Sequence, residues 1–178
     1  MKVSNIDQKN AEVEVVNPSL FQLIFLGGVI GGIAGGLAFG ILLLIQSGNT
    51  DFFLSVSNLF VKFDDVTLGI LSHIGFAILF GILFGLVLIF LPQLGSSQPI
   101  TVVTSLFWGF FLWVIAANVI FRVFFEGLGL EASTFIFDLD YWLLDFNIQS
   151  LTQHLIYGLL LGLTTWNLPK ILERTKIN

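Results

Sequence analysis

Two histidines, His73 and His154, stand inside apolar stretches of this 178-residue sequence and are its best candidates for chemistry. Each opens the same pattern, H-x-x-[FY]-[AG]-x-x-x-G, once in each half of the chain. We favour a role in which each imidazole bonds the backbone of a neighbouring helix or a loop carboxylate and so holds helices together. Two alternatives stay open: axial ligation of haem b or chlorophyll, with the nearby glycines clearing space for the macrocycle, and a proton-relay or pH-sensing role.

Three other polar residues, Asn118, Arg122 and Tyr157, lie in or at the ends of apolar stretches. Polar groups at membrane depth are functional candidates by default. We expect Asn118 to make an interhelical hydrogen bond, and Arg122 to reach the membrane surface or pair with an outer carboxylate such as Glu126. Tyr157 replaces Phe76 of the shared pattern, and its hydroxyl needs a hydrogen-bond partner if it is buried.

Sequence patterns typical of catalysis and metal binding are absent. The chain contains no cysteine, no P-loop pattern and no H-E-x-x-H. Ser72 precedes His73, but adjacent residues on a helix point about 100° apart, so they cannot act as a pair. Asp138, Asp140 and Asp145 could bind a cation if their oxygens converged on one point, but they lack EF-hand spacing. We therefore expect no catalytic residue and no metal site, and the net charge of −5 excludes nucleic-acid binding.

The composition explains what must position these side chains. Hydrophobic residues make up 56% of the chain and charged residues 11%, whereas a soluble domain carries about 25% charged residues. A helix needs about 20 mostly apolar residues to cross a bilayer. Four segments meet that need, at about 20–45, 66–91, 100–124 and 151–168. The sequence therefore predicts an all-α integral membrane protein with four transmembrane helices in contact with the lipid bilayer.

Local signals mark the ends of these helices. Asp65 or Thr67 can cap the second span, Pro99 opens the third, and Ser150 begins a capping box with Gln153 for the fourth, which we expect to stop near Pro169. These boundaries leave polar tails at 1–19 and 169–178 and outer loops at 46–65 and 125–150.

The distribution of basic residues sets the orientation. Four spans place both termini on one side, and most of the lysines and arginines lie on that side. The positive-inside rule therefore puts both termini in the cytoplasm. The basic residues on the inner side are Lys2, Lys9, Lys170, Arg174 and Lys176, against Lys62 and Arg122 outside.

The repeated histidine pattern and the glycines indicate a two-helix unit that occurs twice in the same orientation. The offset between the two histidines also places Gly28 of the first span on Gly109 of the third. Residues four apart share one helix face, and small residues let helix backbones approach closely in lipid. We therefore expect the first span, which carries two glycine rows, to lie at the centre, against the second and fourth spans. The predicted packing residues are Gly28, Gly32, Gly36, Gly40, Ala77, Gly81, Gly85, Gly158 and Gly162, with Gly27, Gly31 and Gly35 forming the other row.

Bulky side chains dominate the remaining surfaces. The third span is rich in Phe and Trp, and we expect it to face lipid or a partner protein. Both outer loops interleave acidic and aromatic residues, which is typical of segments at the membrane interface, of caps over a bundle, or of docking sites.

The repeated helices and the glycine-rich first span resemble small uncharacterised prokaryotic four-helix membrane proteins of the YagU-like kind. The resemblance covers the spans from Leu20 to Leu168 and implies a cytoplasmic-membrane protein with no established catalytic site. Together with the residues, it favours a non-enzymatic scaffold or accessory subunit that forms a homo-oligomer or joins a larger membrane complex. The alternatives are a subunit that ligates haem or chlorophyll through His73 and His154, and a small channel or carrier. The lack of a carboxylate near the middle of any span argues against the last.

Overall fold

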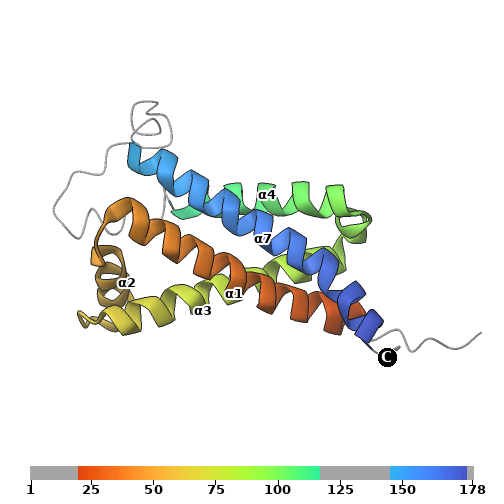
Figure 1. Ribbon diagram of the computed structural model, residues 1–178, viewed down its shortest axis with the longest axis horizontal. Coiled ribbons are helices and arrows are strands. Elements are labelled where there is room, and N and C mark those ends of the chain that lie inside the picture. Colours follow the sequence, from red (N-terminus) through yellow and green to blue (C-terminus); the bar gives the residue numbers. More distant parts are fainter. Residues whose placement is uncertain (1–19, 117–144, 176–178) are drawn as a thin grey trace, which may run out of the picture.

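The computed structural model describes residues 20–116 and 145–175, and every regular element in these ranges is helical. The long helices are α1 (Leu20–Ser47), α3 (Val66–Phe90), α4 (Gln98–Ile115) and α7 (Asp145–Thr175) (Figure 1). Two short elements complete them, α2 (Asp51–Val61) and the 3-10 turn η1 (Pro92–Gly95). The prediction of an all-α protein is confirmed for this part of the chain.

Three of the described helices are long and apolar enough to cross a membrane: Phe25–Ser47, Val66–Phe90 and Gln98–Ile115. They correspond to the first three predicted spans, although the described part of the third ends well before residue 124. The segment predicted as the fourth span, 151–168, lies within α7, which is long but contains more polar residues. A fourth crossing therefore stays a prediction.

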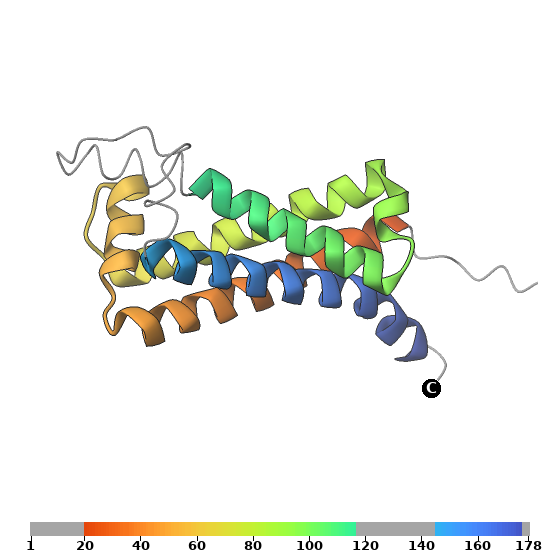
Figure 2. The ribbon, with the colours of Figure 1, turned by 90° about the horizontal axis from the view of Figure 1, so that it is seen from above.

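Helices α1 and α7 run side by side through the middle, with α3 packed on α1 and α4 packed on α7 (Figures 1 and 2). Gly27 of α1 lies against Thr165 of α7 and Gly35 lies against Tyr157, so α1 and α7 are antiparallel. The same logic makes α3 antiparallel to α1 and α4 antiparallel to α7. A buried cluster fills the space that these helices enclose, and its largest fully buried members are Phe84 and Leu161.

Several predicted boundaries need correction. The capping box at Ser150 is wrong, because α7 already begins at Asp145 and Ser150 lies inside it. Pro169 does not end this helix, which continues to Thr175 and bends toward its C-terminal end (Figure 2). A proline removes one intrahelical hydrogen bond and more often kinks a long helix than unwinds it. Asp65, one of the two predicted caps, accepts a hydrogen bond from the Leu68 amide at 3.0 Å.

The outer segment predicted as the loop 46–65 contains the helix α2, which packs on α3. Phe53 is buried there, and its carbonyl group lies directly over Gly69 of α3. After α2 the chain turns at Lys62, whose φ of 54° is left-handed and whose amide bonds to the carbonyl of Asn58. The segment is therefore a cap on one end of the bundle, as one of the sequence interpretations allowed. The other predicted outer loop, 125–150, lies outside the described residues up to position 144, as do the tail 1–19 and residues 176–178.

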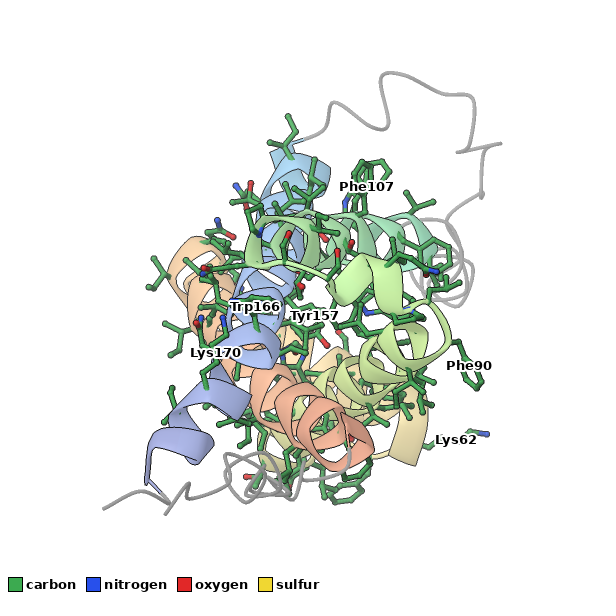
Figure 3. All side chains as sticks on the ribbon, turned by 90° about the vertical axis from the view of Figure 1, so that its right-hand side faces the viewer. Lys62, Phe90, Phe107, Tyr157, Trp166 and Lys170 are labelled. Carbon is green, nitrogen blue, oxygen red and sulfur yellow. The ribbon has the colours of Figure 1, made fainter. Side chains whose placement is uncertain are left out.

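The third span is less outward-facing than its composition suggested. Phe107 is 69% exposed and points away from the bundle (Figure 3), and Phe110 and Phe111 are also exposed. Trp113, in contrast, is 7% exposed, and Trp108 packs against Phe84 of α3 with ring centroids 6.1 Å apart. One face of α4 therefore belongs to the interior, and only the opposite face is free for lipid or a partner.

Candidate functional site

The glycine row Gly28, Gly32 and Gly36 of α1 forms a close seam with α3. A Cβ atom added to Gly28 would lie 2.5 Å from the carbonyl oxygen of Gly81, and one added to Gly32 would lie 2.6 Å from that of Ala77. Real Cβ atoms do not approach a backbone oxygen so closely, so only glycine fits at these positions. Gly36 faces the Cβ of Ala77 in the same seam.

The second row of α1, Gly27, Gly31 and Gly35, forms the seam with α7. Added Cβ atoms would lie 2.9 Å from the Thr165 Cα, 2.9 Å from the Leu161 Cδ1 and 2.7 Å from the Tyr157 Cδ2, respectively. The predicted packing of the first span against the segments 66–91 and 151–168 is thus confirmed, whereas a fourth crossing stays a prediction. Two glycine rows on adjacent faces of one helix let it carry two neighbours at once.

A third seam, between α4 and α7, escaped the sequence analysis as a packing surface. Gly109 lies against the carbonyl oxygen of His154, Gly158 against that of Ser105, and Gly162 against the Ser105 side chain. Ser105 is fully buried and serves here as a small residue. The signal that could have revealed this seam is the four-residue spacing of Thr101, Ser105 and Gly109 on a helix otherwise rich in aromatic residues.

Two predicted packing glycines differ from the rest. Gly40 makes no close backbone approach, since an added Cβ would lie 3.5 Å from the Phe53 ring and 3.8 Å from the His73 ring, which are ordinary contacts. Gly40 is buried and packs against side chains of α2 and α3, so it differs from the other glycines in making side-chain contacts and no close backbone approach. Gly85 is buried in α3, as predicted.

The contacts between α1 and α3 recur between α4 and α7. The sequence separation between equivalent contacts is about one helical turn shorter than the separation between the two histidines. Gly81 meets the carbonyl oxygen of Gly28, and in the second pair Gly158 meets that of Ser105. Gly32 likewise lies against the carbonyl oxygen of Ala77 in the first pair. The equivalent residues of the second pair, at the same sequence separation, are Gly109 and His154, and Gly109 lies against the carbonyl oxygen of His154.

In these contacts Gly109 takes the place of Gly32 and His154 that of Ala77, whereas the histidine pattern aligns Gly109 with Gly28 and His154 with His73. A repeated two-helix unit stays a prediction.

His73 is half-buried and connects α3 to α1. Its Nε2 lies 3.1 Å from the carbonyl oxygen of Gly36, within hydrogen-bond distance. Three phenyl rings surround the imidazole, those of Phe39, Phe52 and Phe53, with centroids 5.0, 6.0 and 5.8 Å away. The contact with Gly36 is the interaction with a neighbouring helix that the favoured interpretation expected of this residue.

His154 differs from His73 in its partner. Its Nδ1 lies 2.7 Å from the carbonyl oxygen of Ser150, one turn earlier in the same helix. The imidazole meets the edge of the Phe39 ring, with the centroids 4.9 Å apart. Phe39 is buried and contacts both histidines, which places them at the same end of the bundle.

This arrangement does not suit a single macrocycle held by both imidazoles. Such a group would have to displace Phe39, and His73 would have to release the Gly36 carbonyl. Among the described residues no three His, Cys, Asp or Glu side chains gather into a group that could hold a metal ion.

Tyr157 is buried in α7 and is the predicted polar residue with the clearest partner. Its hydroxyl donates a hydrogen bond of 2.7 Å to the carbonyl oxygen of Ala77 in α3, and its ring lies inside the bundle (Figure 3). Asn118 and Arg122 lie outside the described residues, so their predicted roles stay predictions.

A pair of glutamines, Gln46 of α1 and Gln153 of α7, was missed. The Gln153 side-chain amide donates a hydrogen bond to the Gln46 side-chain oxygen, and Gln153 is 2% exposed. The two residues line a cavity of about 120 Å³ at the end of the bundle that α2 covers. The available signal was spacing, because Gln153 lies four residues before Tyr157, on the face of α7 that meets α1.

No protein-family model, curated protein or solved structure matches this chain. The resemblance to YagU-like proteins therefore stays a prediction.

Proposed function

We propose that α7 is a fourth transmembrane helix. It follows α1 from the contact between Gln153 and Gln46 to the contact between Thr165 and Gly27. The twelve residue steps from Gln153 to Thr165 correspond to roughly 18 Å along the helix axis, so α7 lies beside α1 over more than half of the hydrocarbon thickness of a bilayer, which is about 30 Å. At its far end the Lys170 ammonium lies 3.8 Å from the centroid of the Trp166 ring, a combination typical of the membrane interface.

Single-cysteine labelling tests this topology, because the chain has no cysteine of its own. With four crossings and cytoplasmic termini, a membrane-impermeant maleimide labels Asn49→Cys in intact cells. It labels Ser96→Cys and Lys170→Cys only after permeabilisation. Labelling of Lys170→Cys in intact cells while Ser96→Cys stays protected would show that α7 does not cross.

We propose further that the protein is a non-enzymatic scaffold or accessory subunit of the cytoplasmic membrane, and that the outer face of α4 is its contact surface. The observation that carries this proposal is that the packing faces of α1 are covered within the chain, whereas one face of α4 is not covered by the described elements. Both glycine rows of α1 are occupied within the chain, so a partner must bind elsewhere. Among the described elements α4 packs chiefly on α7, which leaves its opposite face uncovered. That face consists of Ile100, Val103, Phe107, Phe110 and Phe111.

A photo-crosslinking amino acid at position 107 tests the contact surface in native membranes. Leu71, which is 62% exposed on α3, provides the matched control position. We expect a protein adduct from position 107 and only lipid adducts from position 71. An adduct of twice the monomer mass indicates a homo-oligomer, and a larger adduct of other mass indicates a membrane complex. Lipid adducts alone at both positions would contradict the proposal.

A further inference from the structure

The C-terminal part of α7 leaves the bundle. Thr165 still lies against Gly27 of α1, but beyond it α7 bends away from α1 (Figure 2). Pro169 explains the bend, because a proline removes one intrahelical hydrogen bond. Lys170 is exposed, and Ile171 beside it is 55% exposed. This end of the helix therefore presents a cationic and an apolar side chain next to each other to its surroundings.

The ring of Trp166 holds the Lys170 ammonium in place. The ammonium nitrogen lies 3.8 Å from the ring centroid, and the two residues are about one helical turn apart (Figure 3). The face of an indole ring attracts a cation, which limits where the ammonium can lie. An ammonium has three N–H donors, and a contact with one ring face leaves donors for hydrogen-bond acceptors outside the helix. Lys170 is thus a positioned cation at this end of the bundle.

Acidic side chains and Lys170 lie at opposite ends of the bundle. The acidic side chains that the structure describes lie around α2 and the start of α3, and they are Asp51, Asp64 and Asp65. At the other end, the sequence 166–178 contains one acidic residue, Glu173, and three basic residues, Lys170, Arg174 and Lys176. The side chains of this segment therefore carry a net positive charge, which complements an anionic surface.

We propose that this end of α7 binds the headgroups of anionic lipids, such as phosphatidylglycerol, at the inner surface of the membrane. The inference rests on the crossing of α7 proposed above, because that crossing brings Lys170 to the inner surface. The Lys170 ammonium donates to a phosphate oxygen, Trp166 keeps it at headgroup depth, and Ile171 enters the boundary of the acyl chains. A soluble acidic partner would leave Ile171 in water, whereas a lipid surface accepts both the cationic and the apolar side chain.

Native mass spectrometry of the purified full chain tests the proposal. The protein in detergent is mixed with equal amounts of phosphatidylglycerol and phosphatidylcholine, which both carry a phosphate but differ in net charge. We expect adducts with phosphatidylglycerol to outnumber those with phosphatidylcholine. Equal numbers of the two adducts would mean that carboxylates of the chain itself, such as Glu173, neutralise this end, and would overturn the proposal.

Lysine variants assign the preference to a position. Lys170→Gln should lower the ratio of phosphatidylglycerol to phosphatidylcholine adducts roughly fivefold, the factor that one basic residue near an anionic surface contributes. Lys170→Arg keeps the charge and should retain most of the preference. Lys62→Gln is the matched control, because Lys62 is an exposed lysine at the opposite end of the bundle, and it should leave the ratio unchanged. An unchanged ratio in Lys170→Gln, or an equal loss in both glutamine variants, would refute the site.

Failure of the lipid site and failure of the crossing give different results. Lipid binding in detergent does not depend on the direction of α7 in the membrane, whereas labelling of Lys170→Cys in cells reports the crossing alone. An absent lipid preference with Lys170→Cys protected would overturn the lipid site and leave the crossing intact. A lipid preference with Lys170→Cys labelled in intact cells, while Ser96→Cys stays protected, would overturn the crossing and the placement of the site at the inner surface.

Discussion

The hydroxyl of Tyr157 donates a hydrogen bond to the carbonyl oxygen of Ala77, 2.7 Å away and 80 residues earlier in the chain. The tyrosine ring reaches this carbonyl by passing over Gly35 of α1, where any larger residue would block it. One side chain thus connects α7 to α3 across the central helix. Close helix packing and a buried polar contact depend on the same glycine.

Tyr157→Phe should destabilise the protein by about 0.6–1.5 kcal/mol, since it removes one interhelical hydrogen bond and keeps the ring. Unfolding followed by circular dichroism in detergent measures the change. Thr152→Val is the matched control, because it removes an exposed hydroxyl that bonds only within α7, to the carbonyl of Ile148. Equal losses in both variants would contradict the bridging role of Tyr157.

The seam between α1 and α3 can be tested with a single methyl group. A Cβ on Gly81 would collide with the carbonyl group of Gly28, whereas a Cβ on Gly75, earlier in the same helix, would meet nothing within 4 Å. We expect Gly81→Ala to destabilise the protein by about 1–3 kcal/mol through overpacking. Gly75→Ala should be neutral or stabilising by up to about 1 kcal/mol, because alanine is the better helix former. The reverse order of stabilities would show that the helices are not held in this register.

Glycine spacing allowed the centre of this fold to be predicted. Rows of glycine four apart define a face, and two rows one residue apart define two adjacent faces, so the neighbours of α1 followed from periodicity. The register of the second helix pair did not follow. His154 and Gly158 match His73 and Ala77 in residue type, but contacts depend on how far one helix slides along another. In the observed contacts the His154 carbonyl lies against Gly109 as the Ala77 carbonyl lies against Gly32. This register differs by about one helical turn from the one that the histidine pattern predicts.

The end of the bundle was the least predictable part. The apolar residues of α2 would suit a loop at the membrane interface as well as a packed helix. Only the packing of α2 on Gly69 distinguishes these two alternatives. Gln153 could be assigned to an inner face by its spacing from Tyr157. Its pairing with Gln46, 107 residues away, depends on the relative placement of α1 and α7, which no local pattern encodes.

The N-terminal cap of α3 provides a third prediction. The Asp65 carboxylate accepts the Leu68 amide at 3.0 Å, and loss of such a cap costs about 0.5–2 kcal/mol. Asp65→Ala should therefore lower the unfolding free energy by an amount in this range, whereas Asp65→Asn should retain most of the stability, because an amide oxygen caps as well. Denaturant unfolding in detergent measures both. Equal stability of the alanine variant and the unchanged protein would exclude a capping role.

The two histidines should respond differently to replacement by phenylalanine, which keeps ring packing against Phe39 and removes the ring nitrogens. His73→Phe loses a contact between two helices, with the Gly36 carbonyl, and should lower the Tm by roughly 2–4 °C, the equivalent of about 1 kcal/mol. His154→Phe loses a contact within its own helix, to Ser150, and should change the Tm less. Thermal unfolding of both variants in the same detergent measures the difference.

An absorption spectrum of the purified protein and of these two variants tests whether the histidines ligate a macrocycle. Ligation of one haem or chlorophyll by both imidazoles requires a Soret or pigment band that disappears in either variant. We expect no such band, because Phe39 occupies the position between the two rings that the macrocycle would need. A band that both replacements remove, accompanied by equal losses of stability, would mean that Phe39 moves aside and that the histidines act as a ligand pair and not as separate packing residues.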